Sequence, residues 1–450
     1  MSEQTRSRVW AATPSRLREY LGEMGPSWVA GAIAAGPATM ASLITAGATF
    51  GYGLLWVVVL SAVLGATAQY LAMRLGLLTE SGIVSVVENA LGEGWAWLLV
   101  VDVVLAAGLA QLVIMKTVAD VSETVTGIDA RLWGVAWAVV LAVGLAGRGY
   151  RVVELGAKVM VSGVVVAFLA SAFVVPVDPG AALTGLVPTV SGGVDGALVA
   201  AGILGGAVHI TLVTMQSYTM RAREWTRSDY GLATFDIGAS MLVAFGVYSL
   251  AIFLVAASVL HTPDVQASEL TAIAAAQALG PLVGGSAKWL FLLGLWGAAV
   301  STLGGNTVVP PYLVADKLGW QIDVSDVRYR GLLAAVALLS AGGTFIGGAF
   351  FPLLVLVLAF GLVGTPFALV LVLYLLNRPD VVPVRNSRAA NVGGLVLVGI
   401  TSLLAGSFVR EQAANGLGDP ISLFVVGFAV VLTVASLGLG VKFVREERLA

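Results

Sequence analysis

Two short segments place helix-breaking residues inside long apolar runs. Residues 35–39 read Ala-Gly-Pro-Ala-Thr, and residues 205–209 read Gly-Gly-Ala-Val-His. Proline removes a backbone N–H and glycine weakens a helix, so both runs should be interrupted there. One Gly-Pro pair usually makes only a kink, but two breaks at corresponding places are typical of transporters that bind a solute at mid-membrane. The predicted solute contacts are Gly36, Thr39, Gly206 and His209.

His209 is the one histidine within an apolar run, because His261 falls in a predicted outer loop. Imidazole can ligate a metal, titrate near neutral pH or hydrogen-bond a polar solute. The alternative is a histidine bonded to a carbonyl freed by the helix break. Its position opposite the first break favours contact with the solute.

Two lysines lie inside apolar runs, each four residues from a carboxylate. Lys158 follows Glu154, and Lys116 precedes Asp120. This spacing favours an ion pair within one helix. Asn306 lies in another run, where it could line the core or bond across to a second helix.

The composition indicates that water is not the solvent around most of these apolar runs. Of 450 residues, 58% are hydrophobic and 11% charged, against roughly 25% charged in ordinary soluble domains. There is no cysteine, which excludes disulfides and iron–sulfur clusters. No signal peptide is expected, because residues 1–24 are polar and arginine-bearing.

A membrane-crossing helix needs about 20 apolar residues, which predicts an all-α membrane protein with about twelve spans. These lie near 28–50, 54–77, 95–118, 132–146, 152–175, 196–219, 233–260, 286–314, 331–347, 350–376, 392–409 and 421–443. We expect a cytoplasmic segment at 1–24, a ten-helix transport core at 25–376, and two further helices with a short cytoplasmic tail at 377–450.

The basic residues predict the orientation. With a cytoplasmic N-terminus, inner segments hold nineteen Lys and Arg residues and outer segments hold three. Because inner loops are enriched in these residues, both termini should be cytoplasmic in a multi-pass protein of the plasma (inner) membrane. The lipid bilayer is then a partner, a monomer is compatible with the sequence, and no nucleic-acid partner or cofactor is predicted.

Several motifs along nearly the whole chain resemble the Nramp transporters. In the first half these are Gly25-Pro26, Ala46-Gly47-Ala48-Thr49-Phe50-Gly51-Tyr52, Leu54-Leu55-Trp56, Gln69-Tyr70-Leu71 and Gly149-Tyr150-Arg151 with Glu154. In the second half they are Asp236 with Ala244-Phe245, Ala298-Ala299 with Ser301-Thr302, and Pro366-Phe367-Ala368-Leu369. The resemblance implies a LeuT-like fold of ten core helices, arranged as a five-plus-five inverted repeat with alternating access.

The chain departs from that family at its metal site. The family's Asp-Pro-Gly-Asn is replaced by Gly36, Pro37, Ala38 and Thr39, and its Met-Pro-His by His209, Ile210 and Thr211. By resemblance, the backbone ligands that remain are Ile33 and Gly206, and Thr211 completes the predicted solute site. Without the carboxylate and the thioether, no metal site for bare Mn²⁺ or Fe²⁺ is predicted.

The family's proton-transfer and helix-10 residues are also replaced. Its helix-3 Asp and Glu fall on Gln111 and Ile114, and its helix-10 glutamine falls near Leu358. In some amino-acid transporters of this fold a helix-5 lysine replaces a coupling cation. By that analogy, Lys158 could lie beside Ser301 and Thr302, or pair with Asp102. The predicted coupling or second-site residues are Gln111, Lys158, Ser301, Thr302 and Asn306.

Three functions remain open at this point. The first is an Nramp-related secondary transporter of a small solute, a cation by preference, without the usual proton pathway. The second keeps the fold but carries an amino acid or another small organic solute, and the third is a non-transporting membrane sensor. An enzyme is not expected, because the sequence contains no Ser/His/Asp set, no HExxH motif and no phosphate loop.

Overall fold

The computed structural model describes residues 20, 36–147, 150–189, 193–261, 266, 269–414, 416, 418 and 420–449. All the regular elements within these residues are helices. Ten helical stretches there are long and apolar enough to cross a membrane. The expectation of an all-α membrane protein is therefore confirmed. Ile33 and the half of the first span that precedes Gly36 lie outside the described residues.

The elements follow the predicted order. The first half contains α4 (Pro37–Phe50), η1 (Gly51–Leu54), α5 (Leu55–Thr79), α6 (Ile83–Leu91), α7 (Glu93–Thr126), α8 (Ala130–Gly147), α9 (Tyr150–Val174) and α10 (Pro179–Gly185). The second half contains α11 (Gly193–Val208), α12 (Ile210–Ala222), η2 (Arg227–Asp229), α13 (Tyr230–Ile237), η3 (Gly238–Phe245), α14 (Gly246–Val259), α15 (Ala272–Ala276), η4 (Gln277–Leu279), α16 (Gly280–Val283), η5 (Gly284–Ser286), α17 (Ala287–Thr307), α18 (Val309–Leu318), α19 (Val327–Leu339), η6 (Ser340–Phe345), α20 (Phe350–Leu376), α21 (Arg388–Ala414) and α22 (Pro420–Leu449).

Two local features explain why twelve predicted spans become ten long stretches. The spans predicted at 28–50 and 54–77 meet through η1, a short 3-10 turn, so Pro37–Thr79 forms one continuous helical stretch. The span predicted at 331–347 consists of α19 and η6, and it is not among the ten. The difference therefore comes from two predicted spans that are joined in one stretch and from one predicted span that is not long and apolar enough to be among the ten.

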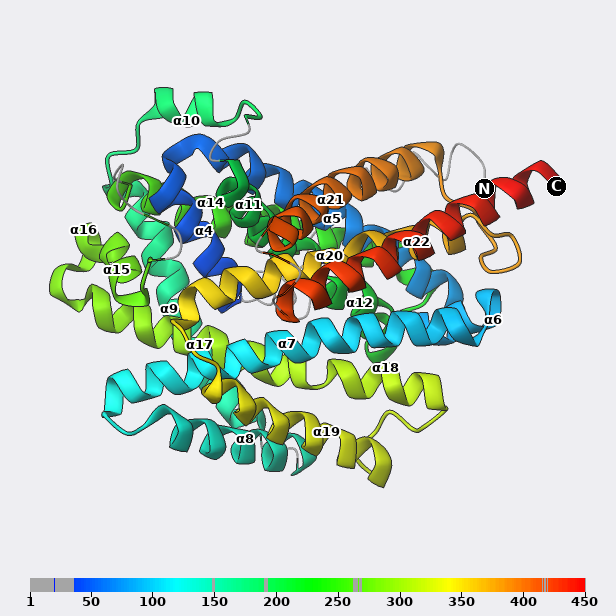
Figure 1. Ribbon diagram of the computed structural model, residues 1–450, viewed down its shortest axis with the longest axis horizontal. Helices are drawn as coiled ribbons and strands as arrows, with labels where there is room; N and C mark the ends of the chain where they lie inside the picture. The colour runs from blue at the N-terminus through cyan, green and yellow to red at the C-terminus, as the bar shows by residue number, and fades with distance from the viewer. Residues whose placement is uncertain are drawn as a thin grey trace.

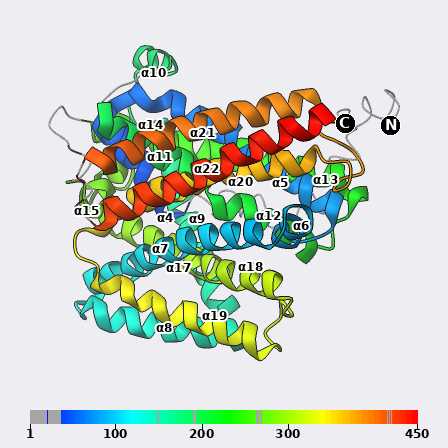
Figure 2. The same cartoon turned by 45° about the vertical axis from the view of Figure 1, so that its right-hand side comes forward.

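Helix α20 forms the centre of the bundle. It packs against α4, α5, α7, α11 and α12 on the inside, and against α21 and α22 on the outside. Figures 1 and 2 both show α21 and α22 lying along α20. Short helices α15 and α16 lie at one end of the bundle (Figure 1).

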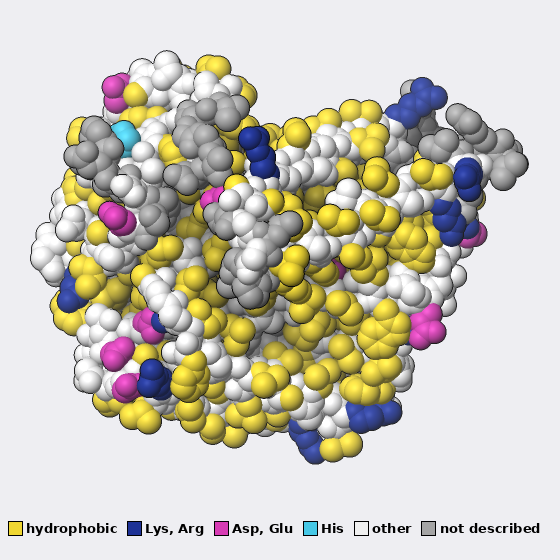
Figure 3. Space-filling model, viewed as in Figure 1, with side chains coloured by type: hydrophobic (Ala, Val, Ile, Leu, Met, Phe, Trp, Pro, Cys, Tyr) yellow, Lys and Arg dark blue, Asp and Glu magenta, His cyan; other side chains and the backbone are white. Residues whose placement is uncertain are grey.

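The surface agrees with a lipid environment. Hydrophobic side chains cover the middle of the face in Figure 3, and most charged side chains on it lie toward the two ends of the long axis. The helices run roughly along that axis (Figure 1). This distribution places an apolar band around the middle of the bundle, as a bilayer requires.

Gly343 allows η6 to approach α7 closely. An ideal Cβ at Gly343 would lie 1.9 Å from the Leu112 carbonyl oxygen. Gly343→Ala is therefore expected to destabilise the protein by about 1–3 kcal/mol, because backbone cannot move aside as a side chain can. Thermal unfolding in detergent measures the effect. Gly342→Ala is the matched control, since its Cβ would lie 3.6 Å from a Leu112 methyl group; equal melting temperatures for the two variants would contradict the prediction.

Candidate functional site

A helix starts where the Gly36-Pro37 pair predicted the first break, and the residues before Gly36 lie outside the described part of the chain. Helix α4 begins at Pro37, and Gly36 is its N-cap with extended backbone, φ −60° and ψ 177°. The Met40 N–H donates to the Gly36 carbonyl oxygen at 3.1 Å, but no side chain caps this end. An ideal Cβ at Gly36 would lie 3.0 Å from the Thr302 hydroxyl oxygen on α17. The first break therefore opens toward Thr302.

The second break lies at His209, between the end of α11 and the start of α12. His209 is the N-cap of α12, and its Nδ1 accepts from the Thr211 N–H at 3.3 Å. The same Nδ1 lies 2.9 Å from the Thr211 hydroxyl oxygen. With the ring proton on Nε2, Nδ1 accepts from the Thr211 N–H and Nε2 presents a donor. With the proton on Nδ1, this atom donates to the Thr211 hydroxyl, the contact with the backbone N–H is no longer a hydrogen bond, and Nε2 presents a lone pair.

The His209 Nε2 atom is the ring nitrogen that no described group satisfies. It is buried and makes no hydrogen bond within the described residues. It lies against α20, where an ideal Cβ at Gly361 would be only 1.8 Å away. A glycine at this position therefore provides the space that the imidazole occupies. Nε2 therefore has a hydrogen-bonding position that no described residue fills.

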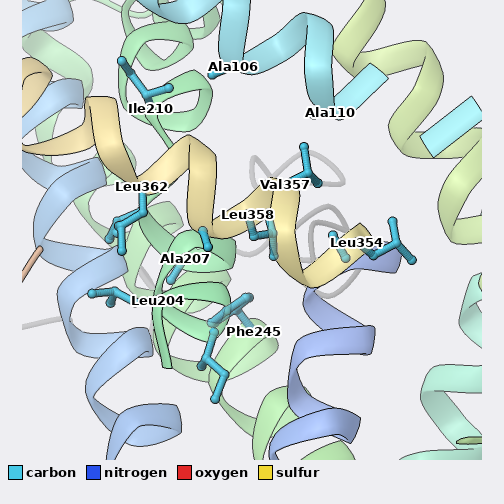
Figure 4. Packing of buried hydrophobic residues seen from close by; sticks show 14 of the residues in the cluster. Ala106, Ala110, Leu204, Ala207, Ile210, Phe245, Leu354, Val357, Leu358 and Leu362 are labelled. Carbon is cyan, nitrogen blue, oxygen red and sulfur yellow. The ribbon is translucent and has the colours of Figure 1, made fainter. Parts of the chain in front are cut away.

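The two breaks face each other. An ideal Cβ at Gly206 would lie 2.5 Å from the Thr39 hydroxyl oxygen, and one at Gly205 would lie 2.4 Å from the Leu358 carbonyl oxygen. Figure 4 shows Leu358 on α20 and Ala207 on α11 within the same packed cluster. The structure thus brings together Gly36, Thr39, Gly206, His209, Thr211 and Thr302. The side chains among them offer hydroxyl and imidazole groups but no carboxylate.

Gln111 and Asn306 form an amide network between α7 and α17. The Asn306 Nδ2 donates to the Gln111 Oε1 at 2.9 Å and to the Ala107 carbonyl oxygen at 2.8 Å. The Gln111 Nε2 donates to the Thr307 hydroxyl at 2.7 Å. Gln111 is buried, and both its oxygen and its nitrogen are satisfied. The network is neutral and cross-links two helices, with no group in it that exchanges a proton near neutral pH.

Lys158 does not lie beside Ser301 and Thr302. Its ammonium is 2.6 Å from Glu154, and the two side chains are 37% and 39% exposed. The residues of α9 that approach Gly297 of α17 are Ala157, Met160 and Val161 instead. The helical period therefore turns Lys158 away from α17, and Asp102 faces α20 rather than Lys158. Ser301 is partly buried next to Thr302.

Lys116 and Asp120 likewise pair within one helix. Their charged atoms are 2.9 Å apart, with side-chain exposures of 9% and 21%. The pair lies in the second half of α7, about four to five turns beyond Asp102. It has no described contact with the two breaks.

Three features of the site were not predicted. The Thr365 hydroxyl on α20 donates to the Val208 carbonyl oxygen at 2.9 Å, which satisfies a group freed by the second break. Gly361 and Gly364 leave room on α20 for His209 and Asp102 respectively. In the sequence these glycines resemble ordinary packing residues of an apolar run. Only their spacing of three residues, on one helix face, carried a signal.

A bundle of membrane-crossing helices, in which α4 starts at Gly36-Pro37 and the chain is interrupted at His209 between α11 and α12, is typical of secondary transporters of the LeuT-like class rather than of enzymes. The chain belongs to the Nramp family: residues 27–411 match the model described as "Natural resistance-associated macrophage protein-like". It is thus a multi-pass membrane protein with the LeuT-like fold implied by the sequence motifs.

Two relatives and one solved structure illustrate the similarity. The "Divalent metal cation transporter MntH" of Mycobacterium tuberculosis is 28% identical over 406 residues, covering 85% of this chain and 89% of the relative. A protein of the same name from Deinococcus radiodurans is 27% identical over 413 residues, covering 89% and 92%. A manganese transporter structure from Eremococcus coleocola superposes with a TM-score of 0.74 at 18% identity, covering 97% and 96%. The structural match establishes the fold.

Proposed function

We propose that this chain is a secondary carrier of a small cation, which binds between the breaks at Gly36 and His209. The observation that supports the proposal is the facing pair of breaks, lined by Thr39, Gly206, His209 and Thr302. Relatives that share most of the chain are named as cation transporters. Carbonyl oxygens freed at a helix break are typical cation ligands in this class of fold.

The proposed cargo is not bare Mn²⁺ or Fe²⁺. A doubly charged ion that leaves water needs anionic or strongly dipolar ligands, and transition metals are selected by ligand type. Gly36 and Thr39 supply neither a carboxylate nor an amide, and the described residues contain no group of three or more His, Cys, Asp or Glu that could hold a metal ion. Hydroxyl, carbonyl and imidazole groups suit a monovalent cation, an ammonium group or hydrated Mg²⁺.

The proposed carrier does not use Gln111 for proton coupling. An amide that is fully engaged with Asn306 and Thr307 has no proton to exchange near neutral pH. This supports the loss of proton transfer at that position of helix α7.

A second candidate function is supported by the helix ends. The N-termini of α4 and α12 both meet the site, and α4 has no side-chain cap. Helix N-termini favour negative groups. An amino acid could therefore place its carboxylate there.

The orientation and the division of the chain remain proposals. The asymmetry of Lys and Arg supports cytoplasmic termini in the plasma (inner) membrane. Residues 25–376 would form the transport core, with 377–450 as two accessory helices. The peripheral packing of α21 and α22 supports this division.

An uptake panel in proteoliposomes tests the proposed function. Mn²⁺, Mg²⁺, a monovalent cation and an amino acid are each offered with and without an imposed pH gradient, with empty liposomes as the control. We expect uptake of Mg²⁺ or of the monovalent cation to exceed that of Mn²⁺. Robust proton-driven Mn²⁺ uptake would overturn the proposal that the substrate site is not suited to bare Mn²⁺.

The remaining outcomes separate the alternatives. Uptake of the amino acid alone would replace the cation carrier by the second candidate. Binding of a panel solute without any transport would favour a sensor that keeps the fold.

A further inference from the structure

Asp102 is a buried carboxylate with no partner for one of its oxygens. Its residue is 1% exposed, and Oδ2 makes no hydrogen bond within the described residues. The other buried aspartate, Asp236, has its Oδ2 3.1 Å from Arg223. No such cation meets Asp102 among the described residues. The two buried carboxylates therefore differ in kind, and only Asp236 has its charge compensated by a described neighbour.

The charged and titratable groups around α7 are engaged elsewhere. On α7 itself, Lys116 pairs with Asp120, while Glu93 approaches Lys317. The elements packed against α7 carry further charged or titratable groups, and each has a described contact. The ion pairs and hydrogen bonds are Glu88 with Lys317, Asp316 with Tyr218, and Tyr374 with Arg378. The ring contacts are Tyr312 with Tyr329, Arg131 over the Phe345 ring, and Lys288 over the Trp289 ring. Glu123 and Arg221 lie in the last turns of α7 and α12. His209 is the remaining titratable group, at the start of α12.

Asp102 and His209 both point at one face of α20. An ideal Cβ at Gly364 would lie 2.2 Å from the Asp102 Oδ1, and one at Gly361 would lie 1.8 Å from the His209 Nε2. Residues three apart on a helix have Cβ positions about 5–6 Å from each other. The His209 Nε2 and the Asp102 Oδ1 are therefore no more than about 10 Å apart. Figure 4 shows α20 between α7, with Ala106 and Ala110 labelled, and α11.

The chemistry of this position favours a proton over a metal ion. An ionised carboxylate without a cation or a full set of donors is costly to bury, so it must be neutralised. A metal ion would need several more ligands, but no group of three acidic, histidine or cysteine residues gathers in the described chain. A proton needs only one lone pair. The two glycines leave space for a carboxyl group and an imidazole but supply no further side-chain ligand.

We propose that Asp102 is a proton-binding residue of the transport path, located between α7 and α20 and one helical turn along α20 from the His209 contact. It lies nine residues before Gln111, about 14 Å along α7, so it is distinct from the neutral amide network. The carboxyl group holds a proton while it is enclosed, as in this conformation, and exchanges it when the path admits water. Coupling of this proton to a solute rests on the proposed transport function; binding of the proton does not.

Infrared difference spectroscopy tests proton binding directly. The full chain in lipid nanodiscs is compared between acidic and alkaline buffer, and the C=O stretching band of a protonated carboxylic acid is recorded. We expect such a band in the wild type, its loss in Asp102→Asn, and its retention in Asp120→Asn. Asp120 is the matched control because it lies on the same helix and is paired with Lys116. No band in the wild type, or an unchanged band in Asp102→Asn, would overturn the proposal.

Two further measurements keep the proposal testable if Asp102→Asn misfolds or if the transported solute is not the one proposed. Gly364→Ala keeps the carboxyl group but crowds Oδ1, so it should shift the band while Gly399→Ala, with open space around its Cβ, should not. An unshifted band in Gly364→Ala would contradict the assignment to Asp102. If the band behaves as expected but a pH gradient leaves all wild-type uptake unchanged, proton binding stands and the coupling role is refuted.

Discussion

Gly361→Ala is expected to weaken solute binding by about tenfold to a hundredfold, as much as His209→Ala does. The added Cβ would lie 1.8 Å from the His209 Nε2, so the imidazole must leave its position against α20. Losing or misplacing a buried polar contact costs about 1–3 kcal/mol, which corresponds to this range of affinity. Titration calorimetry on purified protein, with the panel solute that shows uptake, measures the change in Kd.

A double-mutant cycle separates displacement of the His209 imidazole from a general destabilisation of the fold. If Gly361→Ala acts by displacing the imidazole, it should add little in a chain that already carries His209→Ala. His261→Ala is the matched histidine control, because its ring bonds to the Ala48 carbonyl oxygen near the C-terminal end of α4. Lys116→Ala should also have a smaller effect than His209→Ala. If the losses of affinity caused by Gly361→Ala and His209→Ala are fully additive, or if the control variants lose as much affinity, His209 does not belong to the binding site.

The sequence was sufficient to predict where helix α4 begins. Gly36-Pro37 cannot sit within a regular helix without losing a hydrogen bond, and this constraint is local. The glycines alone do not locate the second break, because Gly205 and Gly206 remain helical in α11 and the interruption falls at His209. Glycine permits a break but does not require one. The residue whose side chain can cap the next helix decided the position.

The partners of polar side chains could not be predicted to the same extent. Lys158 had a local partner four residues away and a possible distant one, and the local pair is the one present. Asp102 offers the opposite case, since it was considered only as a partner for Lys158. Its position depends on which face of α7 meets α20, and that is set by packing of Gly364 against α7 rather than by helical spacing.

The double substitution Gly36→Asp with Thr39→Asn is expected to raise affinity for Mn²⁺ by at least about tenfold, or about 1.4 kcal/mol. It supplies the carboxylate and the amide that bare divalent ions need. Position 36 can accept a side chain, because its backbone is extended and its Cβ would lie 3.0 Å from the rotatable Thr302 hydroxyl. The uncapped N-terminus of α4 also stabilises a negative charge there.

A matched pair distinguishes charge from shape in this experiment. Gly36→Asn with Thr39→Asn has nearly the same volume and hydrogen-bonding reach but no charge, so it should gain far less Mn²⁺ affinity. Calorimetric titration with Mn²⁺ and with Mg²⁺ compares both variants with the wild type. If the Asp and Asn variants bind Mn²⁺ equally, the missing carboxylate is not what limits the native site. If wild type already binds Mn²⁺ as tightly as the Asp variant, its ligands must be groups other than the side chains at positions 36 and 39.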